Sequence, residues 1–256
     1  VVSKMDKEHA DFAGAVASMN KMLKDCEAVP VQLPIGKGPG FGGVVDLVGM
    51  KAYTGAGKDI KASDIPAEMS EAVAAARETL IDAVAATDDD LTEKYLEAGE
   101  LTGAELVTGL KAAVAQGLLV PVLCCDGANA KGLGAILEFA KSTCPAPSAR
   151  PAWTGLKPGT EDVEERAATA DAPFSAFVFK TLFDPYVGRI NLLRVVSGKA
   201  TGDMPATNTS RNAKEKLSGL AIMQGKQSQS VAELAAGDLG AVSKLEETRT
   251  GDTLSD

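Results

Sequence analysis

The chain has little of the residue types on which many active sites are built. Its 256 residues include one histidine, four cysteines and one tryptophan. A single histidine excludes multi-histidine metal sites and catalytic histidine pairs, and it leaves Ser-His-Asp chemistry only to His9. We interpret His9, early in a predicted helix, as a solvated surface residue. Any chemistry must therefore use other groups, and no catalytic or metal-binding residue is predicted.

The cysteines and the apolar runs exclude further classes. Cys26, Cys124, Cys125 and Cys144 lack the C-x-x-C spacing of zinc sites and dithiol exchange. We interpret them as reduced, mostly buried small hydrophobic residues. No apolar run approaches the roughly 20 residues that cross a bilayer, and no basic stretch precedes an apolar segment at the N-terminus. We therefore expect a cytoplasmic protein without a membrane partner.

The charge is acidic and unevenly distributed. The chain has 26 basic and 35 acidic side chains, for a net charge of −9, whereas residues 173–256 hold 10 basic and 9 acidic ones. Because an acidic chain repels phosphate backbones, we expect no DNA binding, and any RNA contact must come from a local patch. The candidates for that patch are Lys180, Arg189, Arg194 and Lys199; paired surface charges are an equally open interpretation.

The first part of the chain alternates helical and strand patterns, which predicts an α/β fold. Helices are expected over residues 10–24, after Pro66, from Asp88 and from Thr102, where Glu105 completes the spacing of a capping box. The runs Val44 to Val48 and Met50 to Thr54 predict a small hairpin or meander. Leu118 to Cys125 is expected to be a buried parallel strand, followed by a crossover helix over Lys131 to Cys144.

The composition changes after Cys144. Residues 145–172 carry four of the twelve prolines, which predicts an extended linker, with Trp153 packed at a domain boundary. Short β-rich runs separated by turns then predict a small barrel or sandwich. Phe174, Phe177 and Phe179 are interpreted as part of its core.

Several segments, in this order, resemble the translational GTPase elongation factor G. Any one could arise by chance, but together they extend over nearly the whole chain. They are Ser3 to Asp6, Pro34 to Gly36, Phe41 to Val48, Lys51 to Tyr53, Glu93 to Glu97, Pro121 to Cys124, Phe174 to Lys180, Asp184 to Arg189 and Gly251 to Leu254.

The resemblance implies an organisation in two domains. Residues 1–144 would be the C-terminal part of a P-loop GTPase-type α/β domain, with an α/β insertion at about 30–115. A linker at 145–172 and an all-β barrel at 173–256 would follow. The family's phosphate loop, switch segments and Mg²⁺ ligands are expected to precede Val1, and no G-x-x-x-x-G-K-[ST] occurs in the chain. The parent would bind and hydrolyse GTP, whereas this fragment alone is predicted to be inactive.

The segment Ser3-Lys4-Met5-Asp6 resembles the family's guanine-reading Asn-Lys-x-Asp. The Asp6 carboxylate would accept hydrogen bonds from guanine N1 and N2, which adenine does not offer, and the Lys4 stem would cover the base. Ser3 replaces the family asparagine, whose side chain would bond to the phosphate loop, with a shorter side chain that has one hydroxyl. A charged turn after a strand is the alternative interpretation.

The family's second base-binding segment falls on Cys125-Asp126-Gly127. A backbone N–H there can bind the O6 of GTP or GDP, but a carboxylate beside O6 would repel it. Asp126 is therefore expected to cap the helix near Lys131 or to point to solvent. Either a divergent paralogue or a one-residue shift of the alignment explains the departure.

The resemblance also implies partners. In the family the barrel contacts the small ribosomal subunit and the insertion faces the ribosomal stalk, so ribosomal RNA and ribosomal proteins are the expected partners. A different class of function remains open, namely a non-catalytic protein or RNA interaction module derived from this family. Ser3 and Asp126 favour that alternative slightly.

Overall fold

The computed structural model describes residues 1–157, 159–225 and 227–256, which form two compact units, Val1–Pro145 and Ala146–Asp256. Each unit has its own buried apolar core. None of the helices in these residues is long and apolar enough to span a bilayer.

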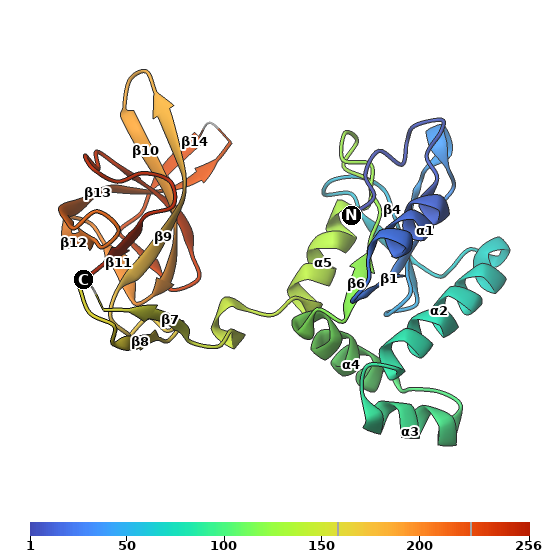
Figure 1. Cartoon of the computed structure of the whole chain (residues 1–256). Coiled ribbons are helices and arrows are strands. Elements are labelled where there is room, and N and C mark those ends of the chain that lie inside the picture. Colours follow the sequence, from blue (N-terminus) through green and yellow to red (C-terminus); the bar gives the residue numbers. More distant parts are fainter. Residues whose placement is uncertain (158, 226) are drawn as a thin grey trace. The chain divides into compact units, whose positions relative to one another are not determined.

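The first unit contains five helices and two small sheets (Figure 1). Strands β1 and β6 pair in parallel, as the apolar run after Gly117 predicted, and β2 to β5 form an antiparallel meander. The elements are α1 (Phe12–Met22), β1 (Glu27–Pro30), β2 (Gln32–Ile35), β3 (Gly43–Asp46), β4 (Lys51–Thr54), β5 (Lys61–Ser63), α2 (Ser70–Ala85), α3 (Asp89–Ala98), α4 (Gly103–Gln116), β6 (Leu119–Val122) and α5 (Leu133–Thr143), with short 3₁₀ turns at Gly38–Gly40 and Ala67–Met69.

The helix starts follow the predicted capping signals. The Asp88 carboxylate accepts the Leu91 N–H at the start of α3, and Thr102 and Glu105 form a complete capping box at the start of α4. The Glu105 side chain also accepts hydrogen bonds from Thr102 and Lys94, and these lower the pKa of Glu105 to about 2. Local sequence thus determines where these helices begin.

The second unit is a closed antiparallel barrel together with a separate two-stranded hairpin formed by β7 and β8 (Figure 1). Pairing of β12 with β13 closes the order β12-β17-β9-β10-β16-β13 into a ring, and β14 extends it from β13. The elements are a 3₁₀ turn at Pro147–Ala149, β7 (Trp153–Leu156), β8 (Val163–Arg166), β9 (Ser175–Asp184), β10 (Gly188–Ser197), β11 (Lys199–Thr201), β12 (Met204–Asn208), β13 (Ala213–Gln224), β14 (Gln227–Ser230), β15 (Glu233–Ala235), β16 (Leu239–Ser243) and β17 (Thr253–Ser255). Closure leaves the ring without free edges.

Two expectations for this region are wrong. The segment 145–172 is not a continuous extended linker, because β7 and β8 pair within it as an antiparallel hairpin. Phe174 is buried in the barrel core, but Phe177 and Phe179 are 44% and 41% exposed. Both phenylalanines alternate along β9 with the buried Ala176 and Val178, so their side chains lie on the outer face of the strand.

Polar side chains from several segments hold the loop between β16 and β17. The buried Glu215 carboxylate accepts the backbone N–H groups of residues 246, 247 and 248 and the Thr248 hydroxyl. Asp252, also buried, accepts hydrogen bonds from Asn208, Arg211 and the Arg249 N–H. Buried carboxylates that satisfy several donors fix a loop in one conformation.

Candidate functional site

The two segments predicted to read a guanine base lie side by side in the first unit. Val2 N–H donates to Leu123 O at 2.7 Å, Cys125 N–H donates to Val2 O at 3.0 Å, and Met5 N–H donates to Cys125 O at 3.2 Å. The buried Met5 and Cys124 side chains belong to one apolar cluster beneath these loops. The fold therefore brings Ser3, Lys4 and Asp6 next to Asp126 and Gly127 across about 120 residues of sequence.

The first of these loops is a tight turn with polar side chains. Lys4 has φ +60°, an uncommon conformation for a residue with a side chain, and its carbonyl accepts the Lys7 N–H at 3.1 Å. Ser3 and Lys4 are exposed and Asp6 is partly buried. A non-glycine residue held in this conformation often marks a functional segment.

Asp6 pairs with a residue that the sequence did not single out. Its Oδ2 lies 2.6 Å from the Lys7 Nζ. The hydrogen bond to Asp6 and the attraction of Asp6 raise the pKa of Lys7, and Asp126 adds to this effect. Only its position beside the four-residue motif could have indicated Lys7.

Asp126 neither caps α5 nor points to solvent, so both expectations for it are wrong. The residue is buried, and Oδ1 accepts the N–H groups of Ala128 and Asn129, each at 3.1 Å, while Oδ2 accepts the Asn129 side chain at 2.6 Å. The hydrogen bond from the Asn129 side chain, followed by those from the two backbone N–H groups, lowers the pKa of Asp126. The carboxylate therefore closes its own turn, and α5 starts only at Leu133.

The neighbouring thiols are unsuited to nucleophilic chemistry. Burial, with a smaller contribution from Cys125, raises the pKa of Cys124 to about 12. Burial also raises the pKa of Cys125. Since a thiolate is the reactive form, both residues act as small apolar groups. In the described ranges no three His, Cys, Asp or Glu side chains gather as a metal site.

The predicted basic patch of the barrel divides into two kinds of residue. Arg189 donates from Nη1 to Glu246 O at 2.6 Å, so it clamps the β16–β17 loop, and Lys199 lies 3.5 Å from Glu233. Lys199 thus agrees with the alternative of paired surface charges, whereas Arg189 bonds to a backbone carbonyl and to no carboxylate of the described residues. For Lys180 and Arg194 no ion pair occurs within the part of the chain that the structure describes. These two remain candidates for phosphate contact.

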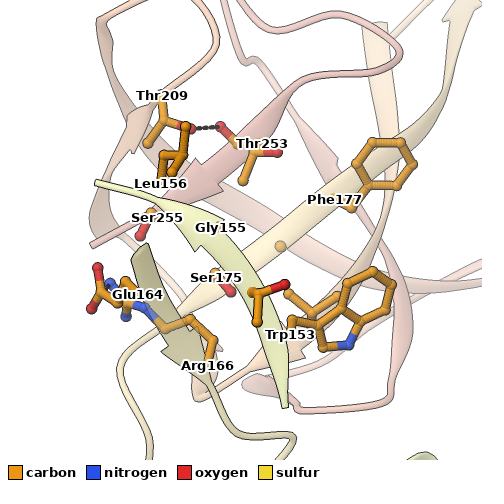
Figure 2. A pocket seen from close by; sticks show the side chains of 13 residues that line it. Trp153, Gly155, Leu156, Glu164, Arg166, Ser175, Phe177, Thr209, Thr253 and Ser255 are labelled. Atoms are coloured by element: carbon orange, nitrogen blue, oxygen red, sulfur yellow. Dashed lines mark hydrogen bonds and ion pairs between the residues drawn. The ribbon is translucent and has the colours of Figure 1, made fainter. Parts of the chain in front are cut away.

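The second unit also has a pocket of about 350 Å³, which the sequence did not predict (Figure 2). Trp153 and Leu156 of the hairpin line it together with Phe177 and Thr253 of the barrel. Arg166, at its rim, lies 3.0 Å from the Asp256 carboxylate, and the Arg150 guanidinium lies 4.5 Å from the Trp153 ring centre. Trp153 thus lines a surface pocket of the second unit.

Comparison with known proteins gives two findings. A family model described as elongation factor G domain 2 matches residues 173–256. A crystal structure of a Thermus thermophilus protein designated ttk003000868 is 28% identical and aligns with a TM-score of 0.79 over 100% of this chain. The alignment covers 35% of that protein, so this chain spans about a third of the length of the structure it matches.

Proposed function

We propose that this chain is an elongation factor G-like fragment and that residues 1–144 are the C-terminal part of its GTP-binding domain. Two findings support the proposal: residues 173–256 match the model of domain 2 of that family, and the whole chain aligns with the Thermus thermophilus protein. In this proposal the parent is a ribosome-associated translational GTPase that hydrolyses GTP to drive translocation or a related step. Residues at about 30–115 form the insertion of that domain.

One observation supports this proposal most directly, namely the backbone pairing of residues 2–5 with residues 123–125. It places a carboxylate, Asp6, and a backbone N–H, that of Gly127, on adjacent loops. Guanine presents two donors at N1 and N2 and an acceptor at O6, whereas adenine presents an amino donor where guanine has O6. The two loops together therefore favour guanine over adenine.

The chain supplies base recognition and no phosphoryl chemistry. The sequence has no G-x-x-x-x-G-K-[ST] loop, so other parts of the parent would hold the phosphates and Mg²⁺. In the longer protein, we expect GTP hydrolysis that purified ribosomes stimulate and that Asp6→Ala reduces. Hydrolysis that ribosomes leave unchanged would contradict the proposal.

The non-catalytic interaction module remains the second candidate. The Asp6–Lys7 ion pair favours it, because that pair engages one oxygen of the carboxylate that guanine needs. The two candidates differ in a simple observation: an interaction module has no preference between GDP and ADP.

For the barrel we propose contact with RNA of the small ribosomal subunit. Lys180→Ala should weaken binding of the chain to purified small subunits, and it should lower the dependence of log K on log salt by roughly one. Lys216→Ala is the matched control, because Lys216 is also an exposed lysine of the barrel and lies 3.0 Å from Asp203. Equal affinities and equal salt slopes for the two variants would show that Lys180 is a surface charge that makes no RNA contact.

A further inference from the structure

The Asp126 turn uses its hydrogen-bond donors selectively. Asp126 N–H and Lys131 N–H bond to each other's carbonyl groups at 3.0 Å, and the N–H groups of Ala128 and Asn129 donate to the Asp126 carboxylate. The Gly127 N–H donates no hydrogen bond within residues 1–157, 159–225 and 227–256, whereas its neighbours in the turn do. Gly127 is exposed. The turn thus leaves available the one donor that the base site requires.

The same bonds remove the conflict between a carboxylate and guanine O6. Both Asp126 oxygens are engaged within the turn, and the residue is 1% exposed. Hydrogen bonds from donors around a carboxylate offset part of its negative charge.

We propose that Asp126 and Asn129 are positioning residues that hold the Gly127 N–H toward the base and thereby set the preference for guanine. This inference rests on the proposed function, because it assumes that a base binds between the two loops. Asp126 does not itself contact the base. Its hydrogen bonds hold the turn in one conformation, so the O6 atom of guanine meets an N–H group that is already oriented toward it.

A residue that stabilises the fold and a residue that orients the Gly127 N–H differ in how their removal changes nucleotide binding. A residue that only stabilised the fold would weaken GDP and ADP binding to the same extent when removed. A residue that orients the Gly127 N–H changes the ratio of the two dissociation constants, because adenine presents no oxygen at that position. The ratio is therefore the informative quantity, even where both affinities are weak.

The test uses the full chain and NMR titrations with GDP and with ADP. Asp126→Ala and Asn129→Ala should each reduce the ratio of the ADP to the GDP dissociation constant at least about fivefold, or about 1 kcal/mol. Asp126→Asn keeps an acceptor for the two backbone N–H groups, and the Asn129 amide can turn its oxygen toward the new NH2 group, so this variant should retain most of the preference. Because Asn129 is exposed, its variant is expected to fold even where Asp126→Ala does not.

Asp184→Ala is the matched control. The Asp184 carboxylate accepts the N–H groups of Tyr186 and Val187, each at 2.9 Å, in a similar turn of the barrel. Its ratio should equal that of the unaltered chain. If the unaltered chain prefers GDP and Asn129→Ala keeps the full preference, the positioning role is wrong and the base site stands. If the unaltered chain shows no preference, the proposed function fails and this inference with it.

Discussion

Glu215→Ala is expected to lower the free energy of unfolding of the barrel unit by about 2–4 kcal/mol. The substitution removes one buried carboxylate and leaves three backbone N–H groups and the Thr248 hydroxyl without their acceptor. A buried donor without a partner costs more than the bond itself contributes. Two further hydrogen bonds hold the same loop, from Arg189 to the Glu246 carbonyl and from the Arg249 N–H to the Asp252 carboxylate. Part of the loop should therefore stay in place.

Urea unfolding followed by Trp153 fluorescence measures this effect. Trp153 is the one tryptophan of the chain and lies in the second unit, so its signal reports on that unit. The control is Glu233→Ala, whose partly exposed carboxylate only faces Lys199 and should contribute less than about 1 kcal/mol. Equal midpoints for the two variants would show that the Glu215 network contributes nothing specific.

The chain alone is expected to bind GDP no tighter than about 100 μM, or about −5.5 kcal/mol. Most of the affinity of phosphate-loop proteins comes from N–H groups, a lysine and Mg²⁺ around the phosphates, and the sequence has no such loop. Asp6 and the Gly127 N–H offer charge-assisted or ordinary hydrogen bonds worth roughly 1.5–3 kcal/mol each at best. The cost of immobilising the ligand then leaves weak binding.

Isothermal titration with GDP and Mg²⁺ tests this limit. Asp6→Ala serves as the reference for heat that does not come from the base site. A micromolar dissociation constant that Asp6→Ala abolishes would mean that the base loops are far better preorganised than two hydrogen bonds suggest. It would also mean that the Asp6–Lys7 pair opens at little cost.

Features encoded by neighbouring residues could be predicted from sequence. The capping box at Thr102 and Glu105, the N-cap at Asp88 and the parallel strand after Gly117 depend on side chains within a few positions. The β7–β8 hairpin could not be predicted, because its apolar residues, such as Leu156 and Val163, remain exposed and give no burial pattern. Its anchor, the Arg166–Asp256 pair, joins residues 90 positions apart.

For the candidate site, the sequence indicated two segments, and the structure brings these segments together in a geometry that could not be predicted. The four-residue motif and the segment after the parallel strand indicated Ser3, Lys4, Asp6, Asp126 and Gly127. The direction of the Asp126 side chain depends on Asn129 and on a turn closed by Lys131, which no motif encodes. The partner of Asp6, Lys7, depends on rotamers of two adjacent charged residues.

A map of amide chemical-shift changes on the full chain tests the central claim, that the two loops form one guanine-reading site. Saturating GDP should shift the amide signals of residues 3–7 and 125–129 together, with the largest change at Gly127, while ADP at the same concentration should leave Gly127 unmoved. GDP shifts confined to one loop, or equal shifts with ADP, would contradict the claim.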